Sequence, residues 1–460
     1  MNIWTESCVM KKVSAFSVAV LLMLSCSERD EPSVSGPDFP QNGQKHFIEV
    51  LLRSTGKEVA SVDMDFSGCS EVFLVKSDVR WNVSVSEPWM SVEVGDNGIQ
   101  VELMLEVNLS GNDRAGHIVF ASDDGDLSER VNVVQAGTSL VGKADFSDMM
   151  LIMNDHSENI WSGYLSCFCD GKREWLFDAF CLSMSRFDGV LVGSADSKVT
   201  QTEYEYAIRE YLGPDKWLDR LDRCISVSRS YIDGGYEPRK VFIAIPHTNC
   251  EEWGDIEGKM MNTKDRREDN VTVACWFVDR MLDAYAAECV KGKYSNLRLA
   301  GFYWQQENGN ILPFYGRQIA GHIHGKNLDF LWIPYFNAYN WSQWAEYGFD
   351  KAWLQPNWLF NDRWQDRSHL YDACSMAAGA SMGVEVEWDS TKDWQRHVDY
   401  WDVYEELGIL DSHALAYYDS GSMIACLDNL SAGKWRTFYE RVASDIARRH
   451  KRFYGYANPE

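Results

Sequence analysis

Two short segments of the chain each end an apolar, strand-like run in glutamate. Glu307 follows the run 299–304, while Glu385 and Glu387 alternate within the run 383–387. Alternate residues of a strand share one face, so these two acids point the same way. Carboxyl groups at two strand ends can cleave a glycosidic bond, because one protonates the leaving oxygen and the other attacks or stabilises the sugar cation.

Aromatic residues stand beside these acids. Trp304 precedes Glu307, and Trp388 follows Glu387. The flat apolar faces of such rings can pack against sugar rings. The chain holds 19 tryptophans; a hydrophobic core accounts for most of them, and we expect the remainder to contact a sugar.

The elements that would position these residues alternate between strands and helices. The predicted strands are 149–153, 189–192, 241–245, 299–304, 330–334, 351–354, 383–387 and 414–418. The predicted helices include 204–212, 271–290, 315–326, 368–378 and 432–449. This alternation predicts a (β/α)8 TIM barrel over 145–455. A doubly wound open sheet is the alternative, but no glycine-rich nucleotide loop follows the first strand.

Barrel active sites lie at the C-terminal ends of the strands, and this rule supplies candidate binding residues. The predicted substrate-binding residues are Asn154, His247, Trp304, Gln306, Tyr335, Asn337, Trp358, Trp388 and Tyr417. Further strand-end residues are Ser194, Asp196, Gln305, Gln355, Asn357 and Tyr418. The set is rich in amides and aromatic rings, which suits recognition of hydroxyl groups. His156, His247, Asp155 and Asp196 have no informative metal-ligand spacing, so we expect neither a metal nor a cofactor.

The positions of the glutamates resemble the large clan of retaining glycosidase barrels. In that clan the acid/base follows strand four and the nucleophile ends strand seven. The resemblance implies that Glu307 is the acid/base and Glu387 the nucleophile, with Glu385 as the alternative nucleophile. Gln306 departs from the asparagine that often precedes the acid/base. Retention or inversion depends on the separation of the carboxyl groups and stays open.

A β-rich segment, 46–138, precedes the barrel. Its alternating runs are 72–75, 81–85, 99–107, 117–121 and 130–135. Runs of this spacing predict an immunoglobulin-like β-sandwich. The residues Trp81-Asn82-Val83, Pro88-Trp89, Asn108, Arg114, Ile118 and 133–137 resemble the BACON domain of Bacteroidetes surface proteins. The resemblance implies a glycan-binding module or a spacer. We expect a spacer, because Trp81 and Trp89 suit the core of a small sandwich.

The N-terminus predicts export and lipidation. Lys11 and Lys12 precede an apolar stretch and a lipobox that ends at Cys26, so residues 1–26 are predicted to be a lipoprotein signal peptide with Cys26 as the lipidated residue. The acidic run 27–31 resembles the surface-export signal of Bacteroidetes lipoproteins. Residues 27–45 are predicted to be a flexible linker. These features imply a cell-surface lipoprotein of the outer membrane.

The formal charge of −25 and the pI of about 4.8 disfavour nucleic acid as a partner. They also disfavour strongly sulfated or uronate-rich polymers unless basic residues gather locally. As a whole, the chain resembles Bacteroidetes lipoproteins with a glycosidase-like barrel of unknown function. We therefore expect a glycoside hydrolase that acts on an extracellular oligosaccharide or polysaccharide, with other surface glycan-utilisation proteins as possible partners. A non-catalytic glycan-binding lipoprotein and a structural spacer or adhesin are the alternatives.

Overall fold

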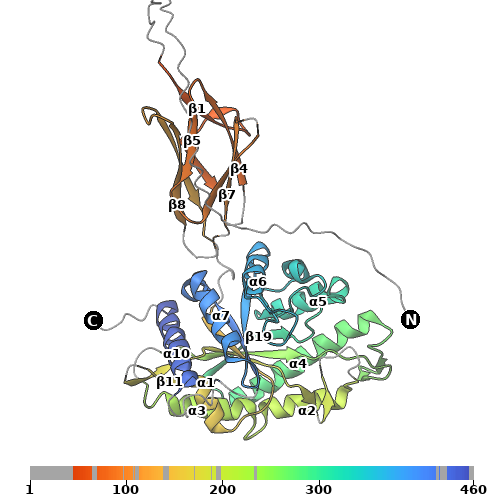
Figure 1. Ribbon diagram of the computed structural model, residues 1–460. Coiled ribbons are helices and arrows are strands. Elements are labelled where there is room, and N and C mark those ends of the chain that lie inside the picture. Colours follow the sequence, from red (N-terminus) through yellow and green to blue (C-terminus); the bar gives the residue numbers. More distant parts are fainter. Residues whose placement is uncertain are drawn as a thin grey trace, which may run out of the picture. The chain divides into compact units, whose positions relative to one another are not determined.

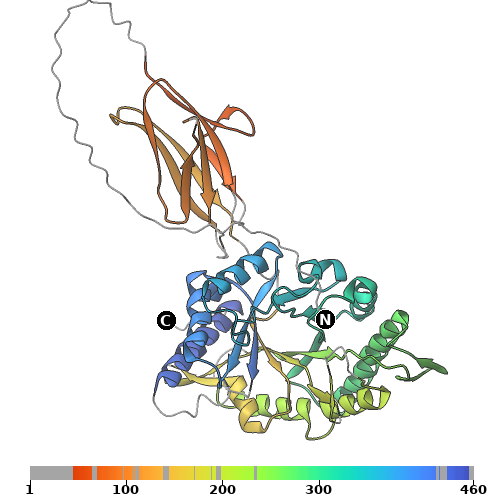
Figure 2. The same ribbon diagram turned by 45° about the vertical axis from the view of Figure 1, so that its right-hand side comes forward.

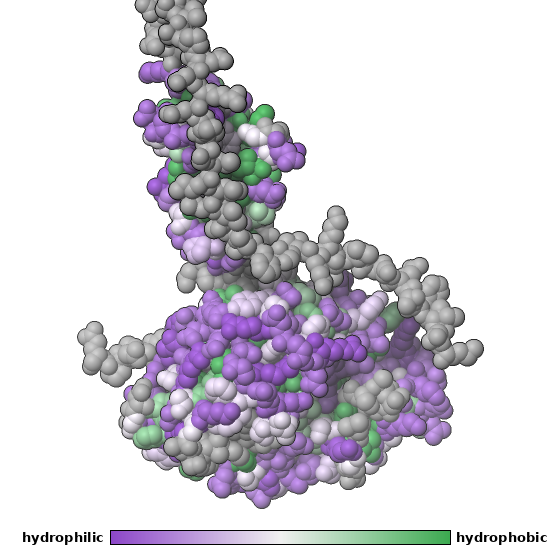
Figure 3. Space-filling model, in the orientation of Figure 1, coloured by the Kyte–Doolittle hydropathy of each residue, from purple (hydrophilic) through white to green (hydrophobic). Residues whose placement is uncertain are grey.

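The computed structural model describes residues 45–454, apart from 65–69, 97, 107, 109–112, 138–144, 170, 188, 193–197, 233–235, 421–423 and 425–432. The predicted signal peptide, with Cys26, and all of the predicted linker but its last residue lie outside the described residues. No helix in the described part of the chain is long and apolar enough to cross a membrane. Hydrophilic residues predominate on the visible face of the barrel region (Figure 3).

The N-terminal region consists of two β-sheets that share one core. Five strands form the first sheet in the order β2-β1-β4-β7-β6, and four form the second in the order β3-β9-β8-β5. The strands are β1 (Ile48–Leu52), β2 (Lys57–Glu58), β3 (Ser61–Met64), β4 (Ser70–Ser77), β5 (Trp81–Val85), β6 (Met90–Val94), β7 (Gln100–Leu105), β8 (Arg114–Ser122) and β9 (Ser128–Gln135). Phe73 of β4 and Phe120 of β8 meet edge to face in this core, at 6.1 Å between ring centroids.

The two tryptophans of the N-terminal motif contribute to packing. Trp81 lies against Phe120, with 5.9 Å between the ring centroids. The guanidinium of Arg114 lies 4.3 Å from the centre of the Trp89 ring and donates to the side chain of Gln135 at 2.8 Å. Both rings are partly buried against the core. Their contacts agree with the predicted packing role.

The C-terminal region is a closed barrel of eight parallel strands with helices around it (Figures 1 and 2). The barrel strands are β10 (Asp148–Ile152), β13 (Ala179–Leu182), β16 (Arg239–Ile245), β19 (Leu297–Trp304), β20 (Asp329–Trp332), β21 (Lys351–Leu354), β22 (Gly383–Asp389) and β23 (Leu415–Ser420). The helices are α1 (Glu158–Leu165), α2 (Gln201–Leu212), α3 (Trp217–Ser228), α4 (Arg267–Val290), α5 (Leu312–His324), η1 (Trp341–Tyr347), α6 (Ser368–Gly379), α7 (Trp394–Glu406), α8 (Ile409–Ser412) and α10 (Lys434–Phe453). The predicted parallel barrel is confirmed.

The predicted second barrel strand is wrong. That strand is β13, which pairs in parallel with β10 and β16. Within the predicted run 189–192, Val190–Leu191 forms β15, which pairs only with β14 (Arg186–Phe187). Every residue of β13 is buried, and a short, fully buried apolar run carries no periodicity that identifies it. Ser194 and Asp196 therefore do not follow a barrel strand and lie outside the described residues; Ser183 follows β13.

Two further hairpins complete the described strands: β11 (Ser166–Cys169) with β12 (Lys172–Trp175), and β17 (Gly254–Ile256) with β18 (Lys259–Met261). The barrel interior is filled by inward-facing residues of alternate strand positions, which form their own apolar cluster. Trp353 occupies this interior and stacks on Phe146 at 5.7 Å. A packed interior closes the barrel beneath its C-terminal end.

A buried ion pair attaches the last helix to the first strand of the barrel. Arg449 of α10 donates from Nε to both carboxyl oxygens of Asp148, at 3.0 and 3.2 Å. The same guanidinium donates to the carbonyl oxygens of Leu410, at 2.5 Å, and Ser147, at 3.2 Å. Burial raises the pKa of Asp148, and the charge of Arg449 opposes that rise. The guanidinium thus joins α10 to three parts of the barrel base.

Replacing Arg449 with Met should lower the free energy of unfolding by about 3–5 kcal/mol, because it leaves the buried Asp148 carboxyl without its partner. Arg452→Met is the matched control on the same helix, since Arg452 and its partner Asp411 are about half exposed. Arg452→Met should lower the free energy of unfolding by no more than about 1 kcal/mol. Urea denaturation followed by tryptophan fluorescence measures both. Equal losses in the two variants would contradict this role for Arg449.

Candidate active site

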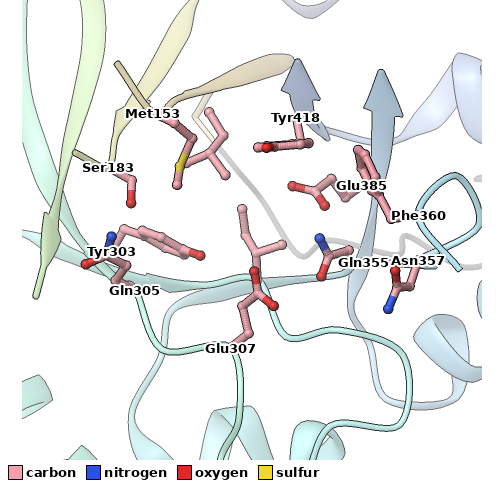
Figure 4. A pocket seen from close by; sticks show the side chains of 12 residues that line it. Met153, Ser183, Tyr303, Gln305, Glu307, Gln355, Asn357, Phe360, Glu385 and Tyr418 are labelled. Atoms are coloured by element: carbon pink, nitrogen blue, oxygen red, sulfur yellow. The ribbon is translucent and has the colours of Figure 1, made fainter. Parts of the chain in front are cut away.

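A pocket of about 300 Å³ opens at the C-terminal ends of the barrel strands (Figure 4). Its walls combine two carboxyl groups with amides, hydroxyl groups and apolar side chains. The lining residues are Leu151, Met153, Ser183, Tyr303, Gln305, Glu307, Ile333, Gln355, Asn357, Phe360, Glu385 and Tyr418. They come from every barrel strand except β16, or from the segments that follow those strands.

Glu307 and Glu385 bring the two carboxyl groups into this pocket. Glu307 follows β19, the fourth barrel strand, and Glu385 lies within β22, the seventh. Figure 4 shows both carboxyl groups pointing into the cavity. Glu385 is 1% exposed, whereas the side chain of Glu307 is exposed to solvent. The pocket therefore has one carboxyl group at its base and one that solvent reaches.

The pKa of Glu385 is raised well above its ordinary value of 4.5, first by burial and then by the charges of Glu387 and Glu307. Neither oxygen of Glu385 accepts a hydrogen bond from the described residues. The amide of Gln355 opposes the rise, so it lies nearby but outside hydrogen-bonding geometry. Burial in this pocket therefore favours the protonated form of Glu385.

The pKa of Glu307 is raised to about 7 by loss of hydration and then by the charge of Glu387. Although solvent reaches this side chain, the pocket walls limit how fully water surrounds it. An acid with a pKa near 7 can both give and take a proton at neutral pH. Glu307 thus has the proton affinity that a general acid and base needs.

Glu387 does not line the pocket. Its side chain is fully buried, and its Oε2 accepts hydrogen bonds from the backbone N–H of Leu359, at 2.9 Å, and from the Tyr400 hydroxyl. Burial raises its pKa to about 7, and these hydrogen bonds oppose the rise. The donors stabilise the ionised form of Glu387, which lies two residues beyond Glu385 on β22.

The loop between β21 and α6 covers Glu387 and supplies Asn357 and Phe360 to the pocket. Arg396 of α7 holds this loop: its guanidinium donates to the carbonyl oxygen of Trp364 at 2.8 Å and lies 4.2 Å from the centre of the Trp358 ring. The Trp358 indole N–H in turn donates to the carbonyl oxygen of Arg396 at 3.0 Å. Trp358 is therefore buried in the support of the site and does not line the pocket.

The other eight predicted binding residues also do not line the pocket. Three of them face the helices, because strand residues alternate between the barrel interior and the surrounding layer. Trp304 packs against the rings of Tyr315 and Phe330. Trp388 stacks on Phe438 of α10, at 5.5 Å.

Tyr417 is the third residue that faces outward. Its hydroxyl donates to Asp148 at 2.7 Å, near the base of the barrel. Its neighbour Tyr418, on the opposite face of β23, lines the pocket.

The remaining predicted residues lie in the loops above the strands. The side-chain oxygen of Asn154 accepts from the Ser185 hydroxyl at 3.2 Å, and the Tyr335 hydroxyl accepts from the side chain of Asn308 at 3.2 Å. Gln306, His247 and Asn337 complete the set. The Gln306 side chain is 9% exposed, burial lowers the pKa of His247 to about 4, and Asn337 is exposed.

Six of the twelve lining residues were not among the predicted site residues. Tyr303, Ile333 and Leu151 are inward-facing residues of strands or strand ends. Because alternate residues of a strand share one face, a known inward-facing residue on each strand would have identified them. Ser183 was missed with its strand. Met153 and Phe360 carry no chemical signal in the sequence. Among the described residues, no three His, Cys, Asp or Glu side chains gather closely enough to hold a metal ion.

Replacing Glu385 with Gln should stabilise the protein increasingly as the pH rises. The raised pKa means that folded Glu385 binds its proton more tightly than the unfolded chain does, so wild-type stability falls above the ordinary pKa of 4.5. Glutamine does not titrate. The melting temperature of Glu385→Gln relative to wild type should therefore increase from about pH 5 to about pH 8. The control is Glu237→Gln, an exposed residue that precedes β16. If the melting temperatures of Glu385→Gln and wild type differed by the same amount at every pH, the result would contradict a raised pKa of Glu385.

Comparisons with known proteins give a family and several distant structural likenesses. No curated protein matches the chain. A Bacteroides ovatus GH5 xyloglucanase in complex with a XXXG heptasaccharide is 11% identical, with 86% of this chain and 99% of that chain covered and a TM-score of 0.29. A protein from Bacteroides thetaiotaomicron is 16% identical, with 22% of this chain and 97% of that chain covered and a TM-score of 0.17. A protein from Bacteroides vulgatus is 17% identical, with 21% of this chain and 94% of that chain covered and a TM-score of 0.15. TM-scores this low carry no argument about function. The model of the domain of unknown function DUF4855 matches residues 151–444. Because this match spans more than half of the chain, the protein belongs to the DUF4855 family.

Proposed function

We propose that the protein is a glycoside hydrolase that cleaves an extracellular glycan with a pair of carboxyl groups. The observation that carries the proposal is the position of Glu307 and Glu385, which project into one pocket from the fourth and seventh strands of the barrel. Burying a carboxyl group that lacks hydrogen-bond partners costs stability, and groups of this kind are found most often at functional sites. Their raised pKa values, close to an accessible cavity, are typical of acids that take part in catalysis.

The two groups share the proton that the reaction needs. Burial and neighbouring charge raise the pKa of both groups, so the pair retains a proton more readily than ordinary carboxyl groups do. The reactive form carries this proton on Glu307 and has Glu385 ionised, because the leaving oxygen needs an acid and the positive charge that develops at the anomeric carbon needs a carboxylate. The pair then has one acid and one carboxylate, as a retaining mechanism requires.

The reaction proceeds in two steps. Glu307 protonates the glycosidic oxygen while a carboxylate oxygen of Glu385 bonds to the anomeric carbon, so the leaving group departs as an alcohol. Ionised Glu307 then removes a proton from water, and the water oxygen displaces Glu385 from the sugar. The second step leaves Glu307 protonated and Glu385 ionised, which is the form in which the pair began the reaction.

In this mechanism the nucleophile is Glu385, whereas the sequence had favoured Glu387. Glu387 is enclosed by Leu359 and Tyr400, whereas Glu385 faces the cavity. In the proposed mechanism Glu387 acts through its neighbours, because its charge raises the pKa of both reacting groups. Tyr303, Tyr418 and Phe360 supply aromatic surface to the pocket, and such rings can pack against a sugar.

The setting of the enzyme is a second part of the proposal. The N-terminal sequence supports lipidation at Cys26 and attachment to the outside of an outer membrane. The spaced residues of the two-sheet region support a BACON-like domain of immunoglobulin-like topology, which we propose acts as a spacer. A surface position would give the pocket access to external oligosaccharides and polysaccharides and to other surface glycan-utilisation proteins.

Glu307→Gln and Glu385→Gln should each lower kcat by at least about 1,000-fold on the true substrate, because each removes one half of the reacting pair. The measurement is release of reducing ends from a panel of host and plant polysaccharides. Glu237→Gln, at the opposite end of the barrel, is the matched control and should retain wild-type turnover.

Unchanged turnover in either pocket variant would contradict the mechanism. Glycan binding without hydrolysis, unaffected by both substitutions, would instead indicate a non-catalytic glycan-binding lipoprotein.

A further inference from the structure

The pocket walls hold acidic side chains and no basic side chain among the described residues. The lining includes two carboxyl groups, and none of the twelve lining residues is Lys, Arg or His. Glu387, directly behind the lining, is a third carboxyl group whose donors favour its ionised form. An anionic ligand in this pocket would therefore meet like charge without a counter-charge.

Two basic residues, Arg396 and Lys392, contact residues of the β21–α6 loop, and neither lines the pocket. The guanidinium of Arg396 bonds to backbone carbonyl oxygens of the β21–α6 loop. The ammonium group of Lys392 lies 5.7 Å from the centre of the Phe360 ring and lowers the pKa of Asp389, but Lys392 does not line the pocket. The segments 193–197, 421–423 and 425–432 contain no Lys, Arg or His.

Buried oxygen atoms at the base of the pocket need hydrogen-bond donors. Both carboxyl oxygens of Glu385 and the side-chain oxygen of Gln305 are buried without a partner among the described residues. The Gln305 amide nitrogen is already engaged, because it donates to the carbonyl oxygen of Met184 at 3.3 Å. Sugar hydroxyl groups supply donors, whereas carboxylate and sulfate groups only accept. An uncharged sugar would satisfy these atoms and an anionic group would not.

We infer that the pocket encloses one uncharged, hydroxyl-rich sugar unit and excludes uronate, sialate and sulfated units. Its volume of about 300 Å³ stands at the lower limit for pockets that enclose a drug-sized ligand, so the rest of the glycan lies outside it. This inference rests on the proposed function for the identity of the ligand as a sugar, and it adds the charge class of the sugar.

The test uses pairs of 4-nitrophenyl glycosides that differ only at C6, with a hydroxymethyl group in one and a carboxylate in the other. Pairs of glucose and galactose configuration, in both anomers, are compared on the full chain. For any pair that is cleaved, kcat/KM should be at least about 100-fold higher for the neutral member, as expected for repulsion between close charges in a partly buried site. A uronide cleaved within about tenfold of its neutral partner would overturn the inference.

Two variants identify the cause of the preference. Met153→Lys introduces a cation of similar length into the lining. It should lower the ratio of kcat/KM for the neutral glycoside to kcat/KM for the uronide by at least about tenfold. Lys392→Met should leave the preference unchanged. A selective loss of uronide cleavage or binding in Lys392→Met would show that Lys392 recognises an anion, and would overturn the inference.

A binding measurement tests the charge class of the sugar independently of whether the protein hydrolyses it. Calorimetry on Glu307→Gln compares neutral and uronic oligosaccharides at equal ionic strength. Binding of neutral oligosaccharides alone supports the inference even if wild type cleaves none of them, an outcome that defeats only the proposed function. Equal or tighter binding of the acidic oligosaccharides, or no binding of either class, overturns the inference.

Discussion

Repulsion among three carboxyl groups is the constraint around which the mouth of the barrel is organised. Burial raises the pKa values of Glu307, Glu385 and Glu387, and the charge of Glu387 raises those of Glu307 and Glu385 further, so the folded chain disfavours three full negative charges at this place. Backbone N–H groups and Tyr400 stabilise the charge on Glu387. Glu385 has no such donors, so its protonated form is favoured.

The rest of the barrel supplies the rigidity that this arrangement needs. The interior beneath the pocket is filled by apolar side chains, and the pair of Arg449 and Asp148 attaches α10 to the base of β10. At the mouth, Arg396 joins α7 to the β21–α6 loop, which covers Glu387 and contributes Phe360 to the wall. The stability given up by burying acids is offset by packing in parts of the fold that take no part in the chemistry.

Sequence reasoning succeeded where the signal was regular and failed where two faces had to be distinguished. The long alternation of strands and helices identified the barrel, and the strand-end acids of its fourth and seventh strands include both carboxyl groups of the pocket. Chemistry alone did not identify the binding residues: Trp304, Trp388 and Tyr417 seemed suited to a sugar, but all three face the helices. The second strand carried no periodicity because every residue of β13 is buried. The choice between Glu385 and Glu387 depends on a loop contact from Leu359, 28 residues away in the chain, which no local pattern encodes.

The most direct test of the central claim is to identify the residue that bonds to the sugar. An activated 2-deoxy-2-fluoro glycoside of a sugar that the enzyme cleaves slows the release of a glycosyl-enzyme, and peptide mass spectrometry then locates the attached sugar. The account predicts a single adduct on Glu385. An adduct on Glu387 or Glu307, or hydrolysis that proceeds without any adduct, would contradict it.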